Sequence, residues 1–186
     1  MKDDMSDDSN KHNKAVMTDL NPAAYRDGRD FHASGALIAP EERAPGDRYF
    51  KSSPDMARVV YRNAHENISF PETDPRHGQG LNYCKWITSE QPGTQEHFSF
   101  NGNLNGILES FLEPGASVGW HRHDDTEEYY YVLEGSLYAE CQDASGAVFR
   151  RDLKAGDLHR VSRGMSHYAR AGERGARFLA IIVKAG

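Results

Sequence analysis

The chain has 186 residues, a length that suits one compact domain with some extension. Its formal net charge is −6 and it has no stripe of Lys and Arg, so we expect no nucleic-acid partner. No apolar run approaches the length that spans a bilayer, and the N-terminus lacks the apolar core of a signal peptide. We therefore expect a cytoplasmic protein with no membrane partner. Cys84 and Cys141 follow no spacing pattern and are predicted to be free thiols.

The composition divides the chain into three parts. Residues 1–19 are polar and acidic, which predicts a disordered tail. Residues 20–100 are predicted to form an N-terminal extension that wraps the main domain, residues 101–186. Pro, Gly and charged residues recur through 39–55 and 71–80 of this extension, and both stretches are expected to be loops.

Three short segments of the extension are candidate strands. They are Arg58–Tyr61, Tyr83–Ile87 and Phe98–Phe100. The first has an alternative, because Ser53 could cap a short helix that begins at Pro54.

From residue 104 onward, short β-rich segments alternate with glycine-containing turns. The candidate strands are 104–113, 116–123, 127–133, 136–142, 147–153, 158–161, 166–170 and 177–184. The turns between them contain Gly115, Gly135, Gly146, Gly156, Gly164 and the Gly172–Gly175 segment. Eight short strands without helical periodicity predict an all-β fold, the closed antiparallel sandwich known as the jelly roll.

Histidines and a glutamate recur at fixed intervals in this region. Side chains at i and i+2 share one face of a strand, so His121 and His123 should point the same way. Glu128 begins the next β-rich segment and can face them if the two strands are neighbours. With the distant His167, these residues supply three imidazoles and one carboxylate, a set that suits one divalent transition metal.

The spacing of these residues resembles the cupin superfamily. Gly115–Gly135, with its ending Tyr131-Val132-Leu133-Glu134-Gly135, is similar to the first cupin signature, and Gly156–His167 resembles the second. The second signature departs where its usual proline is Ser162 and its closing asparagine is Ala171. The resemblance implies a double-stranded β-helix barrel with four metal ligands. These are His121, His123, Glu128 and His167, with Glu127 as an adjacent rival for Glu128.

Such a ligand set leaves two adjacent positions open on a six-coordinate metal. Fe²⁺ is the expected ion, while Mn²⁺, Ni²⁺, Cu²⁺ and Zn²⁺ suit the same donors. Glu128 is a candidate catalytic base as well as a ligand. Tyr130 lies two residues after Glu128 and so points to the same side of the strand. It is either a catalytic acid or base that lines the cavity, or an aromatic side chain that fills the barrel. Tyr129 and Tyr131 point the other way, where they would pack against the extension or the partner of a homodimer.

For four further residues the sequence gives only weak evidence of a functional role. His159 could support the site from outside, but a plain structural role is expected. Arg160 could orient a substrate carboxylate, although a surface salt bridge is the expected role. Trp86 and Tyr83 are expected in the core.

Three classes of function remain open. The expected class is a metal-dependent enzyme that acts on a small oxygenated molecule, most simply a dioxygenase, with a lyase or isomerase as the alternative. A non-catalytic small-molecule-binding barrel is the second class, and a barrel whose metal only stabilises the fold is the third. Fold alone does not choose among them.

Overall fold

The computed structural model describes residues 27–28, 56–63, 70–71, 73–89 and 102–186. Within these ranges the chain is almost entirely β, with one turn of 3₁₀ helix, η3 (Pro75–His77). The strands are β1 (Asp27–Gly28), β2 (Ala57–Arg62), β3 (Leu81–Ser89), β4 (Leu104–Leu112), β5 (Ser117–Arg122), β6 (Thr126–Gln142), β7 (Val148–Lys154), β8 (Leu158–Val161) and β9 (Ser166–Lys184). None of the described segments forms a helix long and apolar enough to cross a membrane.

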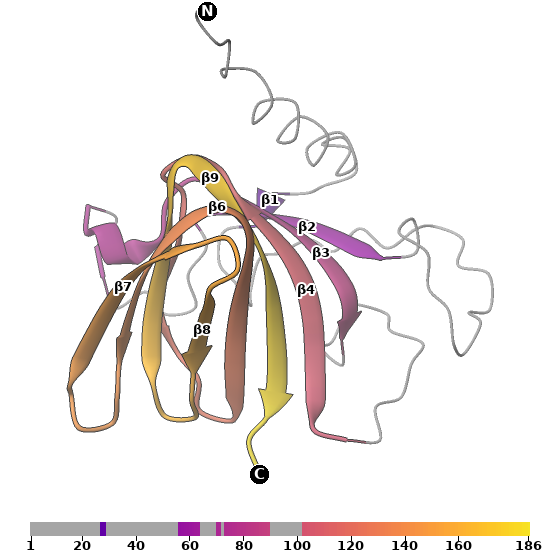
Figure 1. Ribbon diagram of the computed structural model, residues 1–186, viewed down its shortest axis with the longest axis vertical. Helices are drawn as coiled ribbons and strands as arrows, with labels where there is room; N and C mark the ends of the chain where they lie inside the picture. The colour runs from indigo at the N-terminus through magenta and orange to yellow at the C-terminus, as the bar shows by residue number, and fades with distance from the viewer. Residues whose placement is uncertain (1–26, 29–55, 64–69, 72, 90–101) are drawn as a thin grey trace, which may run out of the picture.

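Two long strands, β6 and β9, connect the two layers of the molecule. They arch together over one end of it, so that each contributes one half to each layer (Figure 1). In one layer, the first half of β6 pairs with the second half of β9. On the far side of β9 this layer continues through β4 and β3 to β2, and on the far side of β6 it ends with β8. The second half of β6 lies between β7 and the first half of β9, and β9 continues this layer to β5. Apart from the short parallel pair of β1 and β2, all pairs are antiparallel, which confirms the predicted jelly roll.

The predicted turns at Gly135 and at Gly172–Gly175 are wrong, because β6 and β9 run through them. The glycines bend the strands instead of ending them. Gly135 and Gly175 have positive φ angles, and the pairing of β6 with β9 shifts register on both sides of Glu134. A side chain at Gly135 would place its Cβ 2.1 Å from the carbonyl oxygen of Gly175, so the two backbones approach closely only because this residue is glycine.

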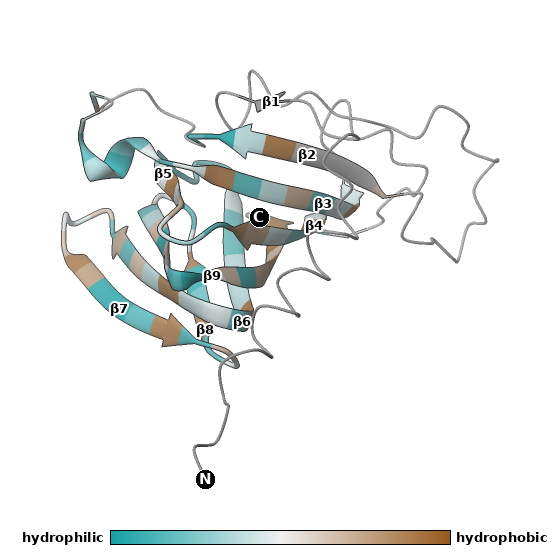
Figure 2. Cartoon of the chain, turned by 90° about the horizontal axis from the view of Figure 1, so that it is seen from above, coloured by the Kyte–Doolittle hydropathy of each residue, from teal (hydrophilic) through white to brown (hydrophobic). Residues whose placement is uncertain are grey.

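The hydrophobic core fills the space between the two layers. It includes Cys84 and Trp86 from β3, which pack with residues of the barrel strands such as Leu108, Val132 and Phe178. Figure 2 shows β2, β3 and β4 side by side in one layer, with β7 on the far side of the molecule. Segments before residue 100 therefore add both strands and core side chains to the barrel.

The strand predictions for the extension have different outcomes. The strand at Tyr83–Ile87 is confirmed as part of β3, and Arg58–Tyr61 lies in strand β2, not in a helix. The 71–80 loop contains η3. The tail at 1–19, the loop at 39–55 and the strand at Phe98–Phe100 lie outside the described residues, and the division into three parts remains a prediction.

One apolar pair lies on the outer surface where β6 and β8 meet. Tyr131 and Leu158 are register partners, with 41% and 56% of their surfaces exposed. The predicted homodimer, for which Tyr131 was one reason, remains a prediction.

Candidate metal centre

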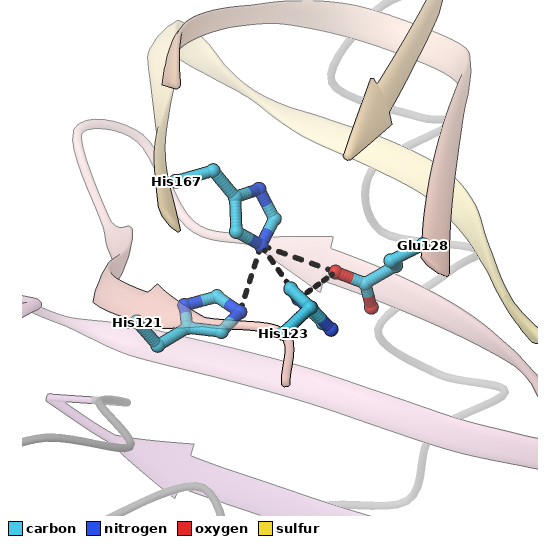
Figure 3. Close-up of side chains that lie close together, drawn as sticks. All are labelled: His121, His123, Glu128 and His167. Atoms are coloured by element: carbon cyan, nitrogen blue, oxygen red, sulfur yellow. Dashed lines mark hydrogen bonds and ion pairs between the residues drawn. The ribbon is translucent and has the colours of Figure 1, made fainter. Parts of the chain in front are cut away.

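Three strands bring the four predicted ligands together inside the barrel. His121 lies in β5, Glu128 in β6 and His167 in β9, while His123 follows directly after the end of β5. His121 and His167 are register partners, so their side chains lie on the same face of the paired strands. Figure 3 shows the four side chains pointing toward one another. All four are buried, and His167 has no exposed surface.

The atoms that face each other are imidazole Nε2 nitrogens and one carboxylate oxygen. The Nε2 of His167 lies 2.8 Å from that of His121 and 3.1 Å from that of His123. Glu128 Oε2 lies 3.2 Å from His167 Nε2 and 3.3 Å from His123 Nε2. One ligand atom from each of the four residues lies within 4.8 Å of the other three.

The other ring nitrogen of each histidine is used outside the cluster. His121 Nδ1–H donates to the carbonyl oxygen of Gly119 at 2.8 Å, and His123 Nδ1 forms a hydrogen bond with Thr126 Oγ1 at 3.0 Å. His167 Nδ1 lies 3.3 Å from Nε2 of His159, so one of these two ring nitrogens donates to the other. When the hydrogen of each ring is on Nδ1, the form that leaves Nε2 free for a metal, each Nε2 presents a lone pair to the centre of the cluster.

Burial and the neighbouring groups set the protonation of the cluster. Burial lowers the pKa of His167 well below its usual value, and the nearby His121 lowers it further. Burial by itself would raise the pKa of the Glu128 carboxyl, but its contacts with the imidazoles of His123 and His167 outweigh this, so the pKa is lowered. The site therefore combines an ionised carboxylate with neutral imidazole, the forms that bind metals.

This arrangement fits a divalent cation. Glu128 Oε2 is fully buried and has no hydrogen-bond partner among the described residues, although two nitrogens lie close to it. Lone pairs that face one another do not form hydrogen bonds, and a buried unpaired carboxylate oxygen is costly. A cation between the four atoms would satisfy all of them at once. Imidazole and carboxylate donors without thiolate are those of a divalent transition-metal site.

The structure separates Glu128 from its rival Glu127. Glu127 points away from the cluster and pairs with Arg160 at 3.0 Å, while its carboxylate also accepts from the hydroxyl of Tyr129. Arg160 therefore makes the surface salt bridge that the sequence favoured. Tyr130 is buried, with its ring centroid 5.3 Å from that of His167 and 4.5 Å from that of Phe178. Its position beside the cluster leaves both of its predicted roles open.

From the sequence a plain structural role was expected for His159, but the structure shows that its ring contacts that of His167. His159 lies in β8 as the register partner of Tyr130, so it shares the inward face of the barrel. Strand parity in β6 marks Glu128 and Tyr130 as inward, but His159 is placed with them only by the register between β8 and β6. The sequence did not reveal which strand pairs with β6 on this side.

The comparisons with known proteins agree with this architecture. Residues 109–182 match the family model of the cupin domain. Over 75 residues, which are 39% of this chain and 56% of the relative, the chain is 36% identical to an oxalate-binding protein of Thermotoga maritima. Over 153 residues, which are 80% of this chain and 36% of the relative, it is 28% identical to the oxalate decarboxylase OxdC of Bacillus subtilis. The chain thus spans only about half of the first relative and about a third of the second.

Two solved structures show the same kind of match. A predicted oxalate decarboxylase from Thermotoga maritima aligns with a TM-score of 0.46 and 26% identity, over 59% of this chain and 86% of that one. A Bacillus subtilis oxalate decarboxylase, studied for its Mn(II) centres, aligns with a TM-score of 0.46 and 28% identity, over 55% of this chain and 25% of that one.

The fold and the site together define a jelly-roll protein with a buried cluster of three imidazoles and one carboxylate between its two layers, a group that could hold a metal ion. Residues 109–182, which form most of this barrel, match the family model of the cupin domain, in agreement with the resemblance that the sequence showed.

Proposed function

We propose that this protein holds one divalent transition metal at His121, His123, Glu128 and His167, and that oxalate or a carboxylate of similar size is its ligand. The observation that carries the proposal is that three imidazole nitrogens and one buried carboxylate oxygen lie within 4.8 Å of one another. The choice of ligand is supported by the relatives, which include an oxalate-binding protein and an oxalate decarboxylase.

A bound divalent metal would act as a Lewis acid toward the carboxylate oxygens of such a ligand. The residues of the chain perform the remaining tasks. Four protein donors would leave part of the coordination sphere of a six-coordinate metal open to the ligand. The buried aromatic rings of Tyr130 and Phe178 exclude bulk water from one side of it. The identity of the ion, for which Fe²⁺ was expected, remains a prediction.

Among the possible reactions we propose cleavage of the carbon–carbon bond of oxalate, the lyase alternative of the sequence analysis. Hydrogen oxalate would give carbon dioxide and formate, so the single proton is conserved and no oxidant is consumed overall. Glu128 and Tyr130 are the candidates for moving that proton, because both lie at the inward face of β6. None of the reported relatives carries the name of a dioxygenase, so that expectation rests on the ligand set alone.

Calorimetry and product analysis of the same samples test this proposal. Protein loaded separately with Mn²⁺, Fe²⁺ and Co²⁺ is titrated with oxalate, and formate and carbon dioxide are then measured with and without oxygen. We expect metal-dependent oxalate binding and equal amounts of the two products, both lost in His121→Ala. Binding without turnover would identify a binding protein, and oxygen consumed in proportion to substrate would support a dioxygenase. Absence of metal-dependent oxalate binding would contradict the proposal.

A further inference from the structure

The three histidines of the cluster differ in how their outward nitrogens are held. His121 and His123 use partners close in sequence, the Gly119 carbonyl and the Thr126 hydroxyl. His167 uses a side chain from a different strand, the imidazole of His159 in β8. The orientation of His167 therefore depends on tertiary structure, whereas the orientations of the other two are set locally.

We propose that His159 is a positioning residue for the metal centre: it accepts the Nδ1–H of His167 and so keeps the Nε2 lone pair of His167 directed at the metal. This role rests on the proposed function, because it has a purpose only if His167 is a ligand. Metal-bound histidines usually donate their second N–H to a carboxylate, a carbonyl or water. Here a second histidine takes that place.

Burial explains why His167 needs such a partner. The side chain of His167 is 0% exposed, so water from outside does not reach its ring. A buried N–H without a partner is destabilising, which would favour rotation of the ring or transfer of the hydrogen to Nε2. Either change would remove the lone pair from the cluster. His159 Nε2, at 3.3 Å, prevents both.

The surroundings of His159 argue against simple packing as its purpose. It lies opposite Tyr130, on the inward face of the barrel, where an apolar side chain would be the ordinary choice. Its ring is tilted by 31° to that of His167, with 5.5 Å between the centroids, and it also meets the edge of Tyr130 at 6.1 Å. His159 thus contacts both the predicted ligand and the predicted catalytic tyrosine.

His159 also borders the solvent. It lines an open cavity of about 790 Å³ between β7 and β8, together with Arg151, Leu153 and Arg160. Water from this cavity could replace the imidazole if the side chain were truncated to alanine. An informative substitution must therefore fill the space while it removes the acceptor, which leucine does. Glutamine is the matched variant, because its amide carries an acceptor at about the distance of the histidine Nε2.

The experiment is a Co²⁺ titration of the full chain, followed by visible absorption, for wild type, His159→Leu, His159→Gln and Arg151→Gln. Arg151 lines the same cavity and is absent from the predicted ligand group, so its variant is the control. We expect His159→Leu to weaken Co²⁺ binding by about 10- to 100-fold and to change the ligand-field bands. His159→Gln should restore both toward wild type, and Arg151→Gln should change neither. His159→Met replaces the leucine variant if that one does not fold.

Three results would overturn the inference. If His159→Leu binds Co²⁺ with wild-type affinity and spectrum, His159 does not position His167. If the leucine and glutamine variants are equally impaired, the effect comes from packing and not from the acceptor. If wild type itself binds no Co²⁺, the proposed metal site fails and the inference fails with it. The first two results leave the proposed function standing, so the two failures are distinguishable.

Discussion

Metal binding should raise the thermal stability of this protein by a predictable amount. The cluster is assembled only in the folded chain, because its members come from three strands, so metal should bind the native state far better than the unfolded one. A ligand at 100 times its Kd then stabilises the native state by about 2.7 kcal/mol. In a chain of 186 residues each kcal/mol raises Tm by about 2–4 °C, which predicts a rise of about 5–11 °C.

Differential scanning calorimetry of metal-free protein with added Mn²⁺ or Co²⁺ measures this rise. His121→Ala should abolish it, since the variant removes one imidazole from the cluster. His77→Ala is the matched control: His77 is also buried, but its Nδ1 bonds to the Phe70 carbonyl and it does not belong to the cluster. A wild-type Tm that does not change with metal would refute the reasoning. So would an equal rise in His121→Ala, because the bound ion would then lie elsewhere.

Three further predictions address protonation, catalysis and the extension. The lowered pKa values of His159 and His167 mean that the unfolded chain binds more protons than the folded chain below the ordinary histidine value of 6.5. As pH drops below about 6.5, the free energy of unfolding of the metal-free protein should therefore fall by up to about 1.4 kcal/mol per pH unit for each histidine, and Tm should fall with it. An unchanged Tm between about pH 7 and 5 would contradict this. Glu128→Gln keeps the size of the side chain but does not accept a proton, so turnover of oxalate should fall about 100- to 10,000-fold, and a variant that retains both its metal and its turnover would exclude the base role. A fragment of residues 100–186 should aggregate, because it lacks Trp86 from the core and exposes the edge of β4; a soluble, monomeric fragment with a cooperative melt would show that the extension is dispensable.

Much of the barrel was predictable because its strands obey simple parity. The inward positions 128 and 130 and the outward positions 127, 129 and 131 follow directly from the two-residue repeat. The choice of Glu128 over Glu127 came from the usual spacing back from Gly135 in the cupin signature, not from this repeat. The resemblance to the cupin signatures named the four members of the cluster, and the structure places them together.

The features that the sequence did not give are those that depend on long-range pairing. Gly135 and Gly175 read as turns, since glycine with positive φ is typical of turns, yet here the same conformation bends a continuous strand. The support of His167 by His159 depends on β8 lying beside β6, which no local pattern reveals. The addition of Cys84 and Trp86 to the core likewise depends on the pairing of β3 with β4.

Pulsed EPR of the Mn²⁺-loaded protein in the presence of ¹³C-labelled oxalate tests the central claim most directly, because it reports the nuclei next to the metal. Couplings to ¹⁴N should appear from the imidazoles of His121, His123 and His167, and a ¹³C coupling should appear on addition of oxalate. The ¹⁴N couplings should weaken in His167→Ala. A spectrum of hydrated Mn²⁺ without ¹⁴N coupling would contradict the metal site, and ¹⁴N coupling without any ¹³C coupling would contradict oxalate as its ligand.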